Sequence, residues 1–232
     1  MNNTMSKLST KISLKCINKN YGSNQILNNI NIDFHEAKLY ILMGQSGSGK
    51  STLLNIIGLL DKPTSGEVII NNTPISKLND NKISKLRMND IGFVFQSYFL
   101  HPKMKAYENI MIPMYINTAY KNIDLKKRSL QLLSLFGLEN KYDMYPNQLS
   151  GGEQQRIAIA RAIANDASII IADEPTGNLD KENEEIVLEC LKKLVLDGKT
   201  VIVVTHNESL LKYADKSYYL NNGSLEEIYY EK

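Results

Sequence analysis

The glycine-rich stretch at residues 44–52 constrains this chain more than any other feature. It reads Gly-Gln-Ser-Gly-Ser-Gly-Lys-Ser-Thr and fits the pattern G-x-x-x-x-G-K-[ST]. The apolar run at residues 39–43 precedes it, and the apolar-rich segment at residues 53–60 follows. The sequence therefore predicts a buried strand, a glycine turn and a helix in succession, the context in which this pattern holds phosphate. A flexible glycine and serine turn with a chance lysine is the alternative, and the agreement between the loop and its flanks argues against it.

The residue types of this stretch, called the phosphate loop below, suit a triphosphate. Glycines let the backbone turn sharply enough to aim several N–H groups at one anion. The helix expected to begin near Ser51 adds its positive dipole end and its unpaired N–H groups. Lys50 is expected to reach the β- and γ-phosphates, and the Ser51 hydroxyl is expected to bind Mg²⁺. The other positions expected to contact the nucleotide are Gly44, Ser46, Gly47, Ser48, Gly49 and Thr52.

Length and charge limit the remaining classes of protein. The chain has 232 residues, of which 43% are apolar, enough for one large domain with a sizeable core. A net charge of +2 implies no strong field for polyanions, so no nucleic-acid partner is expected. Cys16 and Cys190 lie far apart without metal-type spacing, which favours a reduced cytosolic compartment.

No segment predicts a membrane span or a signal peptide. Residues 1–10 are polar and are expected to form a loose tail. No apolar stretch approaches the roughly 18 residues that a membrane span needs. We therefore expect a soluble protein that another chain would carry to a membrane.

The chain is expected to form one domain with an inserted helical lobe. Ile12, Leu14 and Cys16 alternate, with Ile17 out of register, which favours a half-exposed strand at residues 11–19. A second antiparallel strand is expected at residues 26–34. The other expected elements are strands at 67–71, 91–95, 169–172 and 200–205, helices at 79–89, 107–117, 125–136 and 181–197, and a hairpin over 218–230. The catalytic core is thus expected at 11–96 and 165–232, and the helical subdomain at about 97–164.

Two carboxylates follow a buried strand. Residues 169–175 read Ile-Ile-Ile-Ala-Asp-Glu-Pro, and strand ends in a parallel sheet face the ligand crevice. Asp173 suits a contact to Mg²⁺, and Glu174 points elsewhere, where it can polarise a water for in-line attack on the γ-phosphate. A pair of acids that merely begins a loop is the alternative, and the phosphate loop argues against it.

A second glycine-bearing helix N-terminus lies further along the chain. Residues 149–156, the signature segment, read Leu-Ser-Gly-Gly-Glu-Gln-Gln-Arg and precede a helix with apolar residues on one side. Such an N-terminus can face phosphate. By itself a Ser-Gly-Gly helix start is weak evidence of function.

Taken in order, these motifs resemble those of ABC transporter ATPases. The phosphate loop, Gln96 after a strand, the signature segment, Ala-Asp-Glu-Pro, Asn-Leu-Asp at 178–180 and Thr-His at 205–206 follow the family order over residues 11–230. The resemblance implies an α/β P-loop NTPase with a RecA-like core, an N-terminal antiparallel sheet and an inserted α-helical subdomain. The amino-acid sequences of residues 91–96 and 173–180 most resemble one branch of the family. That branch serves lipoprotein release, macrolide and antimicrobial-peptide export, and cell-division signalling.

The resemblance also implies roles for single residues. Tyr21 matches the aromatic residue that stacks on adenine, and Gln96 matches the glutamine that senses Mg²⁺ and the attacking water. Glu174 matches the general base, Asp180 the residue that links two halves of a dimer, and His206 the histidine that contacts the γ-phosphate. Seen alone, these side chains are compatible with ordinary structural positions at strand ends.

Pairing of two copies is a further implication of the resemblance. One chain's Lys50 and Ser51 would hold the γ-phosphate together with Ser150, Gly151 and Gly152 of another chain. The expected ligands are ATP and Mg²⁺, the latter at Ser51, Gln96 and Asp173. The expected partners are a second copy in a head-to-tail dimer and a membrane permease whose helix meets residues 96–113. This places the chain at the cytoplasmic face of the plasma membrane.

The first hypothesis for the function is that the chain is the ATPase subunit of a system that exports or extracts a substrate through a permease. A DNA-repair or chromosome-associated ATPase is disfavoured, because such heads insert a long coiled coil, and no heptad run lies between the phosphate loop and the signature segment. Signalling through a membrane partner, as in the cell-division member of the branch, stays open.

Four departures from the branch pattern do not affect the expected chemistry. Gln45 replaces a common proline in the phosphate loop, and Ala37-Lys38 replaces a Gly-Glu turn. His101 and Lys105 replace a leucine and a capping threonine in the segment expected to face the permease. The loss of a threonine cap can cost about 1 kcal/mol of helix stability.

Overall fold

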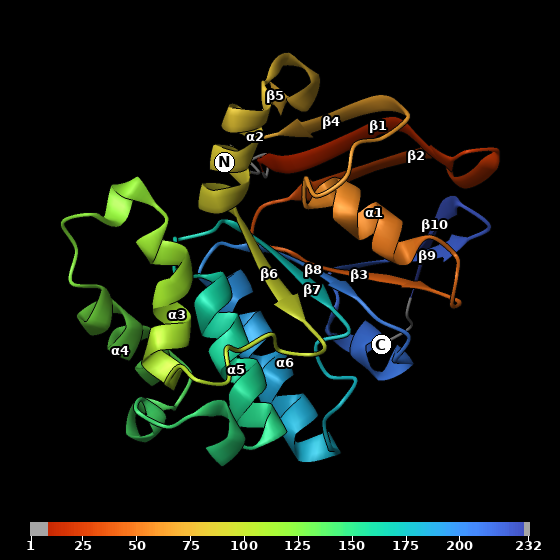
Figure 1. The fold of residues 1–232 in the computed structure, drawn as a ribbon. Coiled ribbons are helices and arrows are strands. Elements are labelled where there is room, and N and C mark those ends of the chain that lie inside the picture. The colour runs from red at the N-terminus through yellow and green to blue at the C-terminus, as the bar shows by residue number, and fades with distance from the viewer. Residues whose placement is uncertain (1–8, 230–232) are drawn as a thin grey trace, which may run out of the picture.

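A computed structural model of the chain describes residues 9–229 and contains two β-sheets with helices around them (Figure 1). The tail predicted for residues 1–10 falls mostly on residues 1–8, which lie outside the described residues, as does the end of the hairpin predicted to reach Tyr230. Within the described residues, no helix is long and apolar enough to cross a membrane.

The first sheet is antiparallel, with the strand order β2-β1-β4-β5. The bounds are β1 (Thr10–Tyr21), β2 (Asn24–His35), β4 (Ser65–Ile70) and β5 (Thr73–Pro74). The alternation expected at Ile12, Leu14 and Cys16 breaks at Cys16, which is exposed, with φ 50°, whereas the adjacent Ile17 is buried. The register shifts between Leu14 and Ile17, and this bulge brings Ile17 to the buried face in place of Cys16.

The second sheet has the order β10-β9-β3-β8-β7-β6 and is parallel except for β10. The bounds are β3 (Leu39–Gly44), β6 (Ile91–Phe95), β7 (Ile169–Asp173), β8 (Thr200–Val204), β9 (Lys216–Asn221) and β10 (Ser224–Ile228). Leu42 pairs with Val204, Val204 with Asp173, and Asp173 with Phe95. The carboxyl ends of these four strands therefore meet at one edge of the sheet.

Alternation along the buried strands divides the core between two faces. Ile202 points to one face, toward α1 (Lys50–Ile57) and the antiparallel sheet, whereas Val201 and Val203 point to the other. That second face is covered by α5 (Gly151–Ala162) and α6 (Lys181–Leu196) (Figure 1). A strand buried on both faces has to be apolar throughout, which explains the continuous hydrophobic runs in the sequence.

The segment between β6 and β7 is largely helical. It contains α3 (Ala106–Tyr115), α4 (Leu125–Leu135) and α5, which pack on one another. Lys105 begins α3 without a side-chain acceptor, but Glu108 compensates in part, since its Oε2 accepts from the Lys105 N–H at 2.7 Å. The boundaries predicted for the core and the helical subdomain stay a prediction.

The predicted elements are found, with ends that differ by one or two residues. The strand at 91–95 has the predicted bounds, and the helix predicted at 79–89 is α2 (Asp80–Asp90). The turn at Asn71 and Asn72, between β4 and β5, has φ values of 47° and 61°, which match the type I′ hairpin turn. The remaining short helices are 3₁₀ turns: η1 (Ile75–Lys77), η2 (Thr118–Tyr120), η3 (Glu139–Lys141), η4 (Pro146–Gln148) and η5 (Glu208–Tyr213).

Candidate nucleotide-binding and hydrolysis site

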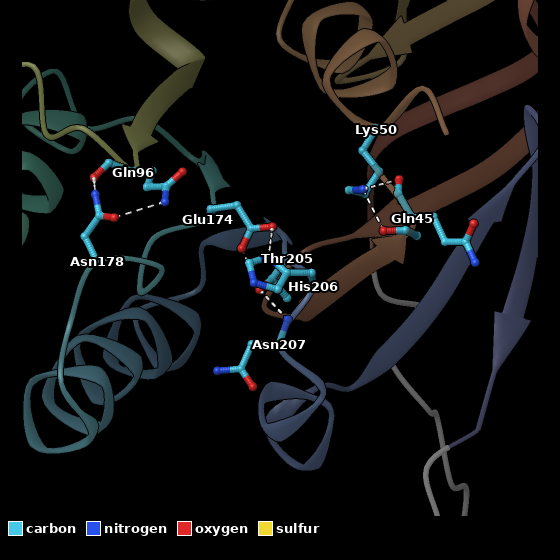
Figure 2. Close-up of polar contacts among 9 residues, drawn as sticks. Gln45, Lys50, Gln96, Glu174, Asn178, Thr205, His206 and Asn207 are labelled. Carbon is cyan, nitrogen blue, oxygen red and sulfur yellow. Dashed lines mark hydrogen bonds and ion pairs between the residues drawn. The ribbon is translucent and has the colours of Figure 1, made fainter. Parts of the chain in front are cut away.

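The phosphate loop joins the end of β3 to the start of α1. Gly49 precedes the helix with φ 101°, a conformation that favours glycine, and no side chain caps the helix N-terminus. The first N–H groups of α1 are therefore left for a ligand. The Lys50 Nζ donates to the backbone oxygens of Gly44, at 2.6 Å, and Gln45, at 2.7 Å (Figure 2). These acceptors are backbone atoms, so the bond to residue 45 does not depend on the glutamine side chain found there.

The loop has the features that an anion site needs. The Ser48 Oγ is buried and has no hydrogen-bond partner within the described residues. A Cβ at Gly44 would lie 2.7 Å from this hydroxyl and would also collide with the backbone oxygen of Leu220. An orphaned hydroxyl, an uncapped helix start and a lysine held over the loop suit a phosphate group. The residues present thus fit a nucleotide.

Asp173 ends β7 at the same edge of the sheet. Burial raises the pKa of its carboxyl, the neighbouring Glu174 raises it further, and Lys50 opposes both. A second cation at this edge would favour the charged carboxylate. Asp173 and Ser51 together offer a carboxylate and a hydroxyl, which are oxygen ligands of the kind that Mg²⁺ takes.

Glu174 lies just beyond Asp173, with its carboxylate held on both oxygens. Its φ of 46° is unusual for this residue type, and its N–H donates to the Val204 oxygen at 2.8 Å. The Thr205 hydroxyl donates to Oε2 at 2.9 Å, and the His206 Nδ1 lies 2.8 Å from Oε1 (Figure 2). The side chain of Glu174 is 17% exposed and that of His206 is 73% exposed. The pair therefore combines an enclosed carboxylate with an accessible imidazole.

Gln96 follows β6 and is hydrogen-bonded to Asn178, a residue to which the sequence analysis assigned no role. Its Nε2 donates to the Asn178 Oδ1, and the Asn178 Nδ2 donates to the Gln96 backbone oxygen, both at 3.2 Å (Figure 2). A Cβ at Gly177 would lie 2.8 Å from this Nε2. The loop between Glu174 and Asp180 therefore passes directly over Gln96. The signal in the sequence that could have pointed to Asn178 is its place as the first residue of the Asn-Leu-Asp motif.

Tyr21 ends β1, is 51% exposed, and has its hydroxyl held by a hydrogen bond. The hydroxyl donates to the Asp61 Oδ2 at 2.6 Å, and the Lys19 Nζ lies 4.7 Å from the ring centroid. The hydrogen bond to Asp61 is the main reason why the pKa of Tyr21 is raised. Sequence reasoning missed Lys19 and Asp61, although Lys19 shares a strand face with Tyr21 by its i, i+2 spacing.

Ser150 begins α5 with a reciprocal cap. Its N–H donates to the Glu153 Oε2 at 2.8 Å, and its Oγ accepts from the Glu153 N–H at 3.2 Å. Gly151 and Gly152 follow, and a Cβ on Gly152 would collide with the Asn183 side chain. The first turns of α5 and α6 therefore pack closely.

Asp180 caps α6, where the Asp180 Oδ1 accepts from the Asn183 N–H at 2.9 Å. The Asn183 Nδ2 also donates to both carboxylate oxygens of Asp180, at 3.0 and 3.1 Å. Asn183 thus joins the cap of one helix to the signature segment of the other, a connection that the sequence reading did not include.

The structure brings most of the predicted residues to one edge of the sheet but keeps the signature segment apart. Lys50, Asp173, Glu174 and His206 follow from neighbouring strands. In contrast, α5 packs on α3, α4, α6 and β6, whereas α1 packs on β2, β3, β7 and β8. One chain therefore presents two separate glycine-bearing helix starts.

Comparison with known proteins identifies the family. The family model described as ABC transporter matches residues 27–177, more than half of the chain. The chain belongs to the ABC transporter family. It is accordingly an ATP-binding subunit with ATP hydrolase activity, and the predicted fold class is confirmed.

Relatives of this ABC transporter protein carry related names. The uncharacterized ABC transporter ATP-binding protein MJ0796 of Methanocaldococcus jannaschii is 45% identical over 223 residues, which are 93% of this chain and 95% of that protein. The lipoprotein-releasing system ATP-binding protein LolD of Bacteroides thetaiotaomicron is 39% identical over 92% of this chain and 98% of its own length. The macrolide export ATP-binding/permease protein MacB of Campylobacter jejuni is 42% identical over 92% of this chain, but only 33% of that protein is matched.

Solved structures of MJ0796 share the architecture. One is described as dimeric and superposes with a TM-score of 0.82 at 44% identity, covering 95% of this chain and all of the other. A second is described as a dimeric post-hydrolysis state bound to ADP and Pi, with a TM-score of 0.82, 42% identity and the same coverage. The resemblance inferred from the motifs is therefore confirmed at the level of family and branch.

Proposed function

We propose that this chain powers export or extraction of a peptide, drug or lipoprotein through a separate membrane permease. The observation that carries the proposal is the meeting of Lys50, Asp173 and the Glu174–His206 pair at one sheet edge. The relatives named for lipoprotein release and macrolide export support the direction of transport. The work would be done at the cytoplasmic face of the plasma membrane, where the permease holds the chain.

In this proposal, the chain's own residues bind and orient the nucleotide. The Lys50 ammonium moves from the loop carbonyls to the β- and γ-phosphates, and the phosphate-loop N–H groups surround the same oxygens. Ser51, Asp173 and Gln96 would hold Mg²⁺, which would neutralise phosphate charge there. Tyr21 offers its exposed ring face to the adenine.

Glu174 acts as the general base in the same proposal. Its carboxylate accepts a hydrogen bond from the attacking water and takes the proton as the water oxygen bonds to the γ-phosphorus, while the bond from that phosphorus to the β,γ-bridging oxygen breaks and ADP leaves. His206 turns its exposed imidazole toward that phosphate and stabilises the charge that develops there. Since the pair of contacts now made to Thr205 and His206 uses two of about four acceptor positions on the carboxylate, room remains for water.

Two copies would complete each other's sites. The start of α5, at Ser150, Gly151 and Gly152, lies apart from the phosphate loop of the same chain. In this proposal it therefore contacts the nucleotide that a second copy holds. The dimeric structures of MJ0796 support a head-to-tail dimer here, with Asp180 at the contact between the halves. Closure around ATP excludes water, and hydrolysis removes the shared anion so that the halves separate.

The permease would bind in an apolar groove next to Gln96. The groove has a volume of about 930 Å³, and its lining includes Phe99, which is 66% exposed, and Ile116, which is 71% exposed. The Arg161 Nη2 donates to the Tyr98 oxygen at 2.6 Å and so supports the turn between Gln96 and the groove. An amphipathic helix with an apolar face fits such a groove. Movement of that helix would reach Gln96 through two residues of backbone.

Three experiments test this proposal. In Lys50→Ala we expect ATP hydrolysis to be lost while circular dichroism shows a retained fold; unchanged turnover would refute the role of the loop. In Glu174→Gln with ATP we expect light scattering to show a dimer, and a persistent monomer at high protein concentration would count against pairing.

Purification of the chain from native membranes should recover a permease with it, whereas recovery of a small division-type membrane protein alone would favour signalling instead of transport.

A further inference from the structure

Thr205 supports the Glu174 carboxylate from a fully buried position. Its hydroxyl donates to the Glu174 Oε2 at 2.9 Å and accepts from the Asn207 N–H at 3.0 Å (Figure 2). The residue is 0% exposed, so water does not compete for the hydroxyl. It directly follows β8, and none of the roles proposed above uses it.

The direction of this hydrogen bond is determined. A hydroxyl carries one proton, and an ionised carboxylate can only accept, so the proton of Thr205 points at Glu174. The Asn207 N–H donates to the same hydroxyl oxygen and holds it from the other side. The branched Cβ of threonine restricts χ1 further. The hydroxyl therefore has one orientation available.

Thr205 is also anchored to the strand that carries the phosphate loop. Its N–H donates to the Leu42 oxygen at 3.1 Å, and Leu42 lies two residues before Gly44. The Glu174 N–H donates to the oxygen of Val204, the residue before Thr205. The carboxylate is thus positioned relative to both β3, which leads into the phosphate loop, and β8, which leads to His206.

His206 is the less constrained of the two side chains on this carboxylate. It is 73% exposed, and its proposed task requires it to turn toward the γ-phosphate. The Glu174 Oε1 would then lose that contact, and Thr205 would remain on Oε2. A carboxylate with one buried anchor keeps its direction, whereas a carboxylate without one is free to rotate about its last bonds.

We propose that Thr205 is a positioning residue for ATP hydrolysis, whose hydroxyl holds the Glu174 carboxylate in place while His206 turns toward the nucleotide. The inference rests on the proposed role of Glu174 as general base. Thr205 touches no reacting atom. Its effect comes from geometry, because a misplacement of about 1 Å in a reacting group can cost on the order of 100-fold in rate.

The test compares two buried threonines in the full chain, Thr200 at the start of β8 and Thr205 directly after its end. Thr205→Val removes the hydroxyl and keeps the shape; we expect kcat to fall by about 10- to 100-fold while the Kd for ATP without Mg²⁺ changes by less than about twofold. Thr205→Ser restores the hydroxyl and should restore most of kcat. The matched control is Thr200→Val, since Thr200 is also 0% exposed and donates to the His35 oxygen at 3.1 Å, at the opposite end of β8. Thr200→Val should lower stability without changing kcat.

A structural readout accompanies the kinetics. In crystals grown with a non-hydrolysable ATP analogue, we expect the Glu174 carboxylate of Thr205→Val to leave the position that it has in the wild type, and that of Thr200→Val to keep it. Glu174→Gln should already lose most of its hydrolysis, so adding Thr205→Val should not lower the residual rate further.

Several results would overturn the inference. These are a wild-type kcat in Thr205→Val, equal slowing in Thr200→Val, or further slowing in the Glu174→Gln background. If the valine variant does not fold, Thr205→Ser and Thr205→Ala differ by the hydroxyl alone, and equal kcat values in them would also overturn it. A wild-type kcat in Glu174→Gln would instead refute the general base, and this inference with it.

Discussion

The ion pair between Lys19 and Asp61 lies beneath the Tyr21 ring, and its loss should be measurable in stability. The Lys19 Nζ lies 2.7 Å from the Asp61 Oδ1 and donates to the Lys62 oxygen at the same distance. The Lys19 side chain is 10% exposed and that of Asp61 is 28% exposed. Asp61→Ala therefore leaves a largely buried ammonium group with one backbone acceptor and one ring face.

The magnitude follows from this burial. Breaking a fully buried ion pair by removing one partner costs about 3–5 kcal/mol, because an uncompensated charge remains inside. An exposed pair contributes about 0–1 kcal/mol. Asp61 is partly exposed and the Lys62 oxygen remains, so we expect a loss of about 2–3 kcal/mol in the free energy of unfolding. For a chain of this size that corresponds to a Tm lower by about 4–12 °C.

The assay is urea unfolding of the nucleotide-free chain, followed by circular dichroism. Lys62→Ala is the control, because the Lys62–Asp80 pair at 2.9 Å is exposed on both sides and should change stability by less than about 0.5 kcal/mol. Asp61→Asn removes the charge and keeps only one acceptor oxygen for Lys19 and Tyr21, so its loss of stability should fall between the two. If Asp61→Ala costs no more than Lys62→Ala, the pair is solvated and the reasoning from burial is wrong.

The pH dependence of this difference is a second check. Burial raises the pKa of Asp61, but hydrogen bonds from Lys19 and Tyr21 outweigh it, so the pKa in the folded chain lies below 3.8. A lowered folded pKa means that the stabilisation is fully present above the unfolded pKa and is lost as pH falls through the folded value. The gap between wild type and Asp61→Ala should stay constant near neutral pH and shrink below about pH 4. A gap that grows in acid would contradict this sign.

The remaining predictions concern binding, pairing and backbone strain. Tyr21→Ala should raise the Kd for ATP by about 5- to 150-fold, from roughly 1–3 kcal/mol of stacking, and leave the Kd for inorganic tripolyphosphate unchanged; equal losses for both ligands in calorimetry would exclude base stacking. Ser150→Ala should cost about 1 kcal/mol through the lost cap and, in the Glu174→Gln background, should abolish the ATP-dependent dimer; a dimer of unchanged stability in light scattering would refute the pairing role. Ala37 has φ 53°, so Ala37→Gly should raise the free energy of unfolding by about 0.5–1 kcal/mol, and a decrease on urea unfolding would show that the turn is unstrained.

Local signals made much of this fold predictable. Apolar runs at 39–43 and 201–204 mark strands that are buried on both faces, and helices begin where Asn79, Asp124 and Asp180 cap them. A cap acts within three residues and a buried strand needs apolar side chains throughout, so both leave a signal in the sequence itself. The motif order then led to the family, which the comparisons confirm.

Signals that depend on a partner strand were less reliable. Continued alternation from Ile12 and Leu14 would put Cys16 on the same face of the strand, but the register shifts between Leu14 and Ile17, and Cys16 is exposed. Ile17 broke the pattern in the sequence and was the true inward residue. A bulge is set by pairing with β2 and β4, which a single strand does not record.

The sequence by itself determined the family, the order of strands and helices and the residue types available at the phosphate loop, because each of these depends on neighbours within a few positions. Only the tertiary structure decided which side chains support them. The bond from Thr205 to Glu174 spans 31 residues, that from Gln96 to Asn178 spans 82 residues, and that from Tyr21 to Asp61 spans 40 residues. Such contacts are created by sheet register and by the packing of α1 between two sheets, and no local pattern encodes them.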